Sequence, residues 1–122
     1  MQRLLSTVAT LLLTVSSALA QAEAFRAGAY AQDITPRSFP ISVNGGMTDR
    51  TATAAHDRLH ARCLVLDDGR EQIAIGIVDS CMMPRELLDR AKQIAASRTG
   101  IPTERMLISA THTHSAPAAM RC

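Results

Sequence analysis

The order of apolar segments between residues 72 and 110 constrains the fold more than any other feature of the sequence. Residues 72–78 are apolar at nearly every position, which suits a strand that is covered on both faces of a sheet. Residues 84–99 carry apolar side chains at helical spacing, and Gly100 is a good terminating residue. A short apolar strand follows at residues 106–110. This order predicts a parallel βαβ crossover, which is right-handed in nearly all proteins.

A β-hairpin is predicted directly before the crossover. Residues 59–66 are rich in branched apolar side chains, and Asp68-Gly69 separates them from the strand at 72–78. A two-residue turn at this place would set the register of the two strands. That register opposes three pairs of residues: Asp67 with Arg70, Arg58 with Asp79, and His56 with Cys81.

Earlier in the chain, residues 28–34 are expected to form a first short strand that ends at the sequence D-I-T-P. Residues 36–55 show little periodicity and include Asn44-Gly45-Gly46, so we expect a long loop there. The predicted fold class is α/β, with a mixed sheet in which the β-hairpin is followed by a right-handed βαβ crossover.

The first 20 residues have the pattern of a secretory signal peptide. Arg3 supplies a positive start, residues 4–15 are mostly apolar, and Ala18-Leu19-Ala20 fits a signal-peptidase site. A membrane anchor is the alternative, but it needs roughly 20 mostly apolar residues, and this stretch is shorter and broken by hydroxyls. We therefore expect residues 1–20 to be cleaved and residues 21–122 to be secreted or periplasmic.

Charge and composition exclude some partners and frameworks. The net charge is +2 with Arg and Lys scattered among acids, and the chain has one Tyr and two Phe, so no nucleic-acid partner is expected. The three cysteines are an odd set, which predicts no disulfide framework. On the predicted hairpin, Cys63 and Cys81 lie roughly 20 Å apart, too far to bridge.

Polar residues follow both strands of the crossover. Asp79 ends one strand and His112 follows the other, and ligands gather outside the carboxyl ends of parallel strands. In an extended segment, His112 and His114 project from one face and can present both imidazoles to a cavity, where neutral imidazole is a good zinc ligand. A His-x-His pair is a weak signal by itself, because polar loop histidines are more frequent. Ser115 lacks a glycine-framed elbow, so we expect a loop-capping hydroxyl rather than a nucleophile.

Five motifs in order resemble the start of the neutral/alkaline non-lysosomal ceramidases. They are D-I-T-P (33–36), H-D-R-L-H-A-R-C-L-V-L-D-D-G (56–69), V-D (78–79), G-I-P (100–102) and I-S-A-T-H-T-H-S (108–115). The resemblance implies a secreted or membrane-associated zinc amidohydrolase that cleaves ceramide to sphingosine and a fatty acid. It implies that His112 is a ligand of one Zn²⁺, and that His114 lies beside the metal and helps to hold substrate or water. The resemblance also implies two partners: a ceramide-like lipid amide as the substrate, and a membrane that the protein contacts peripherally.

The chain departs from the family pattern in two ways. Ala116 stands where the family usually has glycine, and the family's other zinc ligands (a histidine, a glutamate and a tyrosine) lie further downstream than Cys122. The resemblance therefore accounts for His112 alone, with His56, Asp79 and His114 as conceivable substitutes, although a catalytic zinc needs about three protein ligands.

These departures leave three hypotheses about the protein open. On the first, residues 21–122 are the N-terminal part of a ceramidase-like catalytic domain, an incomplete domain that binds zinc weakly and is inactive alone. The second is a small secreted binding or structural module that keeps only the fold. The third is a compact metal-binding protein that uses His112, His114 and a carboxylate at the same end of the sheet.

Overall fold

The computed structural model describes residues 24–117, 119 and 120. Its elements in chain order are β1 (Arg26–Asp33), β2 (Ile41–Val43), β3 (Arg50–Ala52), β4 (His60–Asp67), β5 (Gln72–Val78), α1 (Arg85–Thr99), the 3₁₀ turn η1 (Thr103–Arg105) and β6 (Met106–Ala110). The predicted signal peptide lies outside the described residues. Within them, we find no helix long and apolar enough to cross a membrane.

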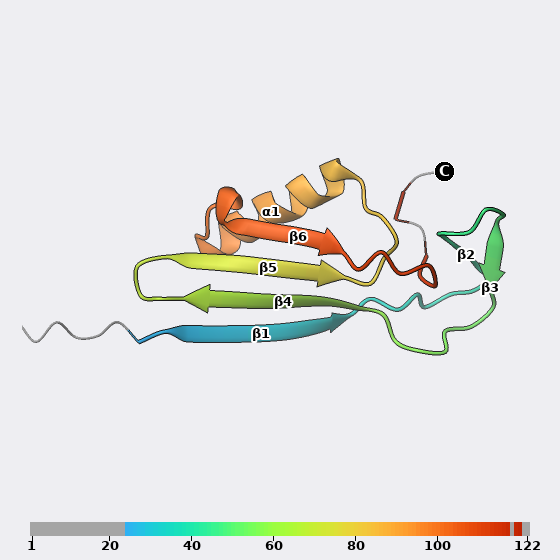
Figure 1. The fold of residues 1–122 in the computed structure, drawn as a ribbon, viewed down its shortest axis with the longest axis horizontal. Helices are drawn as coiled ribbons and strands as arrows, with labels where there is room; N and C mark the ends of the chain where they lie inside the picture. The colour runs from blue at the N-terminus through green and yellow to red at the C-terminus, as the bar shows by residue number, and fades with distance from the viewer. Residues whose placement is uncertain (1–23, 118, 121–122) are drawn as a thin grey trace, which may run out of the picture.

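The main sheet has four strands in the order β1-β4-β5-β6 (Figure 1). The pairs β1–β4 and β4–β5 are antiparallel, and β5–β6 is parallel. This is the predicted α/β fold, with a mixed sheet, the β4–β5 hairpin and the β5–α1–β6 crossover. The two short strands β2 and β3 form a separate antiparallel pair near the end of the sheet to which β5 and β6 point (Figure 1).

The predicted register of the β4–β5 hairpin is wrong by two residues. Asp67 pairs with Gln72 instead of Arg70, which leaves residues 68–71 in the turn. The Asp68 carboxylate accepts hydrogen bonds from the N–H groups of Arg70 and Glu71, so the side chain stabilises a turn longer than the Asp-Gly signal suggests. Because the shift is even, each residue keeps its predicted face of the sheet.

The shift changes which residues meet at the end of the hairpin. His60, and not Arg58, lies opposite Asp79, as the hydrogen bond from the Asp79 N–H to the His60 carbonyl oxygen (2.9 Å) shows. The predicted pairing of His56 with Cys81 is wrong for the same reason. Cys63 and Cys81 are both free thiols, which confirms that these two cysteines do not bridge.

The long loop predicted at residues 36–55 contains the β2–β3 hairpin, and this expectation is corrected. Strands of three residues carry too few side chains for a periodic pattern. Distant contacts hold them instead: Val43 forms a β-bridge with Pro117, and the Asn44 N–H donates to the Ala116 carbonyl oxygen at 3.1 Å. The hairpin is therefore fastened to the segment that follows β6.

Helix α1 begins and ends where its terminal residues predict. Pro84 occupies the N-cap, and Gly100 adopts a left-handed conformation (φ 77°) and donates its N–H to the Ala96 carbonyl oxygen. No residue of α1 is fully buried, and the apolar Leu87 and Ile94 remain 47% and 45% exposed. This sparse core is consistent with an incomplete α/β domain.

Asp79 connects the ends of β4 and β5. Its carboxylate accepts hydrogen bonds from the His60 N–H (2.9 Å) and the Arg62 guanidinium (2.8 Å). Burial opposes ionisation, but these two donors outweigh it and hold the Asp79 pKa below its ordinary value. The lowered pKa means that the ionised carboxylate stabilises the folded state.

We expect Asp79→Asn to lower the free energy of unfolding by about 1–2 kcal/mol near neutral pH, because a charge-assisted hydrogen bond is lost. A carboxylate with a lowered pKa stabilises the fold above its ordinary pKa of 3.8 and loses this contribution as pH falls through the lower folded value. Urea unfolding across this pH range should therefore show the difference shrinking in acid. A wild-type minus variant difference in unfolding free energy that stays constant with pH would contradict this role of Asp79. Asp57→Asn is the control, because the Asp57 side chain is highly exposed.

Candidate metal centre

The chain turns sharply at the first histidine after β6. The Thr111 N–H still continues the sheet by donating to the Val78 carbonyl oxygen at 2.9 Å. His112 then adopts φ 60°, and it is the one non-glycine residue with positive φ in the described part of the chain. Such a conformation costs of order 1–3 kcal/mol and is concentrated at functional sites. The prediction that residues 112–114 are extended is therefore wrong.

The turn brings the His112 ring against the segment that follows β5. Its Nδ1 lies 2.8 Å from the Cys81 carbonyl oxygen. A carbonyl can only accept, so Nδ1 carries the proton and donates it, and Nε2 of the neutral ring keeps its lone pair. Histidines that bind metals almost always donate their other ring N–H in this way. His112 is thus held in the tautomer and orientation of an Nε2 ligand.

The second histidine faces this lone pair. Nε2 of His114 lies 3.3 Å from Nε2 of His112, and the ring centroids are 4.9 Å apart at 77°. Either a hydrogen bond from a protonated His114 Nε2 to this lone pair or a cation bound by both nitrogens accounts for the close approach. Two imidazole ligands of a tetrahedral zinc, each at about 2.0–2.1 Å, would be separated by about 3.3–3.4 Å. The observed spacing has this value.

Cys81 supplies a third donor that the sequence did not reveal. Its side chain is buried, and its Sγ lies 3.8 Å from Nδ1 of His112. One ligand atom from each of Cys81, His112 and His114 lies within 4.8 Å of the others, so this group could bind a metal ion. The 3.8 Å contact places the sulfur beside the Nδ1 edge of the His112 ring.

The candidate substitutes from the sequence have other partners. The Asp79 carboxylate is bonded to His60 and Arg62, as described above. His56 is exposed and pairs with Asp57, with Nδ1 and Oδ1 3.2 Å apart. Among the described residues, neither His56 nor Asp79 joins the group of potential ligands. The polar residues after β5 and β6 do share one end of the sheet, but Cys81 approaches the histidines where Asp79 was expected.

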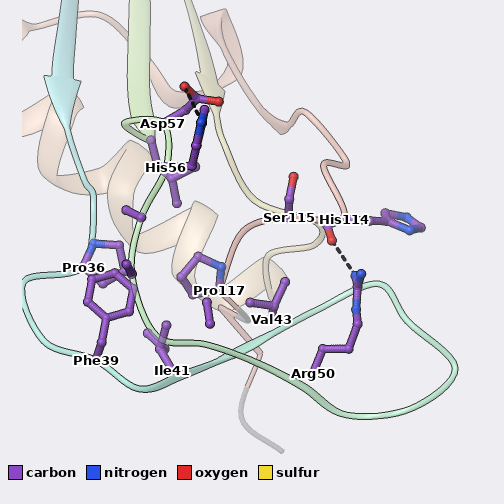
Figure 2. A pocket seen from close by; sticks show the side chains of 14 residues that line it. Pro36, Phe39, Ile41, Val43, Arg50, His56, Asp57, His114, Ser115 and Pro117 are labelled. Carbon is purple, nitrogen blue, oxygen red and sulfur yellow. Dashed lines mark hydrogen bonds and ion pairs between the residues drawn. The ribbon is translucent and has the colours of Figure 1, made fainter.

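A mostly apolar pocket of about 280 Å³ is lined in part by residues 114 and 115. Figure 2 shows the His114 ring pointing away from the apolar residues, while its backbone carbonyl oxygen accepts a hydrogen bond from Arg50 at 2.7 Å. The apolar lining residues labelled there are Pro36, Phe39, Ile41, Val43 and Pro117. Residues 114 and 115 thus line the cavity, while the His114 ring points away from its apolar residues.

The two residues that follow the histidines have structural roles. Ser115 Oγ lies 3.1 Å from the Thr113 hydroxyl, which agrees with a loop-capping hydroxyl. Ala116 is completely buried and does not have positive φ, so the backbone at this position does not require the glycine usual in the ceramidases.

Comparisons with known proteins add no assignment. A scan of the chain against protein-family models finds no match, and a search of curated proteins finds no significant relative.

We expect the chain to bind one zinc or cobalt ion through this group. Each of the variants Cys81→Ala, His112→Ala and His114→Ala removes one ligand. Each should weaken metal binding by more than roughly 10- to 100-fold, which is the typical loss when only a hydrogen-bond partner of a ligand is removed. Cys63→Ala and His56→Ala should leave affinity unchanged. A Co²⁺ titration that is monitored through the absorption bands of the bound ion measures these affinities. A thiolate-to-cobalt charge-transfer band that disappears in Cys81→Ala would identify sulfur as a ligand.

Affinity in this titration should fall as the pH is lowered, because the ligands must be deprotonated. Weak binding that is equal in all five variants would contradict the site. Weak binding that is lost in His112→Ala and unchanged in the other four variants would instead agree with the expectation from the sequence, in which His112 is the single ligand that the chain supplies.

Proposed function

We propose that the chain holds one Zn²⁺ through Cys81, His112 and His114 and takes part in hydrolysis of the N-acyl amide of ceramide-like lipids. The observation that carries the proposal is the 3.3 Å separation of the two histidine Nε2 atoms, with His112 oriented by its bond to the Cys81 carbonyl. The T-H-T-H-S resemblance to the ceramidases supports the reaction class, and the predicted signal peptide supports a secreted or periplasmic location.

The donor set fits zinc. Zn²⁺ is a borderline-soft ion that binds both thiolate and imidazole, and three protein ligands leave a fourth position open, as in catalytic zinc sites. His112 and His114 are exposed, so the open position can be reached from solvent. When bound, zinc supplies Lewis-acid polarisation of a carbonyl and acidifies water to a pKa of about 7.

The chain's own residues would orient this chemistry. The His112–Cys81 hydrogen bond keeps one imidazole lone pair directed at the ion. The apolar pocket lined by residues 114 and 115 suits part of the alkyl chain of a lipid amide. Ser115 is not needed as a nucleophile, because its hydroxyl has no histidine partner among the hydrogen bonds of the described residues.

The resemblance and the geometry differ on His114. The ceramidase pattern assigns the second histidine to substrate or water, whereas the spacing of the Nε2 atoms supports a role as a ligand. We propose ligation. His114→Ala should then release the metal, and a variant that loses hydrolysis but retains stoichiometric zinc would instead support the substrate role.

A second candidate function is metal binding without catalysis. The observation that favours it is that three donors come together within the described residues themselves. Two results together would establish the binding module and refute the amidohydrolase. They are stoichiometric zinc in the 122-residue chain and no ceramide hydrolysis by the longest protein that this reading frame encodes.

The test of the proposed reaction is hydrolysis of a ceramide with a fluorescent N-acyl chain by the longest product of this reading frame. We expect His112→Ala to abolish hydrolysis and lower the zinc content, because the oriented ligand is lost. Ser115→Ala should retain most of the activity. Full hydrolysis after His112→Ala would remove the metal role, and loss of activity with zinc retained in Ser115→Ala would point to a serine nucleophile.

A further inference from the structure

The β2–β3 hairpin contacts the second histidine at two places. The first is Gly45, which has φ 94°, a conformation that favours glycine. A Cβ atom at this position would lie 2.4 Å from Cγ and 2.7 Å from Cβ of His114. These are atoms at the base of the side chain, so they cannot move away by a simple rotation of the ring. The absence of a side chain at Gly45 leaves the space that the His114 side chain occupies.

The second contact fixes the backbone of the same residue. Arg50 donates from its guanidinium to the His114 carbonyl oxygen at 2.7 Å (Figure 2). A hydrogen bond from a charged donor is among the stronger ones in proteins. Gly45 and Arg50 therefore restrain the side chain and the main chain of His114 from one hairpin.

The hairpin is itself anchored on the loop that it restrains. Val43 bridges to Pro117, and the Asn44 N–H donates to the Ala116 carbonyl oxygen. The Asn44 side chain in turn accepts from the Gly45 N–H at 2.7 Å, which stabilises the turn that brings Gly45 close to His114. The arrangement is thus a closed set of contacts between residues 43–50 and residues 114–117.

We propose that Gly45 and Arg50 are positioning residues for the metal centre, which hold His114 Nε2 at ligand distance from His112. This inference rests on the proposed function, because the position of His114 affects metal affinity only if His114 binds the metal. It adds that metal affinity depends on a hairpin that contributes no ligand. Outer-shell residues of this kind typically change metal affinity by about 10- to 100-fold.

The chain offers a matched control for the glycine. Gly100 also has positive φ (77°), but a Cβ there would meet no atom within 4 Å. Gly100→Ala therefore imposes a similar backbone strain without a clash and far from the histidines in the sequence. Any effect of Gly45→Ala beyond that of Gly100→Ala reports on His114.

The experiment measures Co²⁺ affinity and absorption spectra of the full chain, with Gly45→Ala, Arg50→Ala, Arg50→Lys and Gly100→Ala as variants. We expect Gly45→Ala and Arg50→Ala to lower affinity by about 10- to 100-fold and to alter the cobalt bands. Arg50→Lys should recover part of the affinity, because lysine can donate to the same carbonyl. Gly100→Ala should match the wild type in affinity and spectrum.

A metal-free measurement separates this inference from the proposed function. Nuclear Overhauser contacts between the His112 and His114 rings, recorded without metal, should be present in the wild type and in Gly100→Ala and lost in Gly45→Ala. If the wild type binds no metal, the proposed function fails and these contacts alone decide the positioning role. Retention of the ring contacts and of wild-type affinity in both Gly45→Ala and Arg50→Ala would overturn it.

Discussion

The parallel pairing of β5 with β6 is the constraint on which the rest of the structure depends. Val78 lies beside Ala110 in this pairing, and the Thr111 N–H extends it by one more hydrogen bond to Val78. Parallel strands that are joined by a helix have their carboxyl ends at the same edge of the sheet. Cys81 and His112 therefore meet although 31 positions separate them in the chain.

The donor group then forms through local turns at this edge. Positive φ at His112 reverses the chain so that its ring reaches the Cys81 carbonyl, and the strain of that conformation is offset by the hydrogen bond and by the contacts around His114. The β2–β3 hairpin closes the opposite side of the loop. Backbone pairing places the candidate ligands, and a small number of turn residues orients them.

Patterns within one segment predicted most of the fold. The apolar run of β5, the helical spacing of α1 and the Pro84 and Gly100 signals each depend on neighbouring residues, and the structure has these elements where the sequence indicates them. The hairpin register failed because the Asp68 side chain stabilises a longer turn. The β2–β3 pair was missed because contacts with residues 116 and 117 hold it, and no local pattern encodes such contacts.

The candidate site was predicted in part for similar reasons. The two histidines attract attention as a closely spaced pair, whereas Cys81 has no neighbour in sequence that marks it as a ligand. Its position two residues beyond Asp79, after the strand that pairs with β6, was the available signal. Gly45 was visible only as a flexible residue, because its contact with His114 depends on how the hairpin packs.

The most direct test of the metal centre is a crystal structure of the zinc-loaded chain, with anomalous data collected at the zinc absorption edge. We expect one anomalous peak at about 2.0–2.1 Å from Nε2 of both His112 and His114 and about 2.3 Å from Cys81 Sγ. The His112 Nδ1 contact with the Cys81 carbonyl oxygen should be preserved. A peak bound elsewhere, or bound to His112 through Nδ1 with that contact broken, would contradict it.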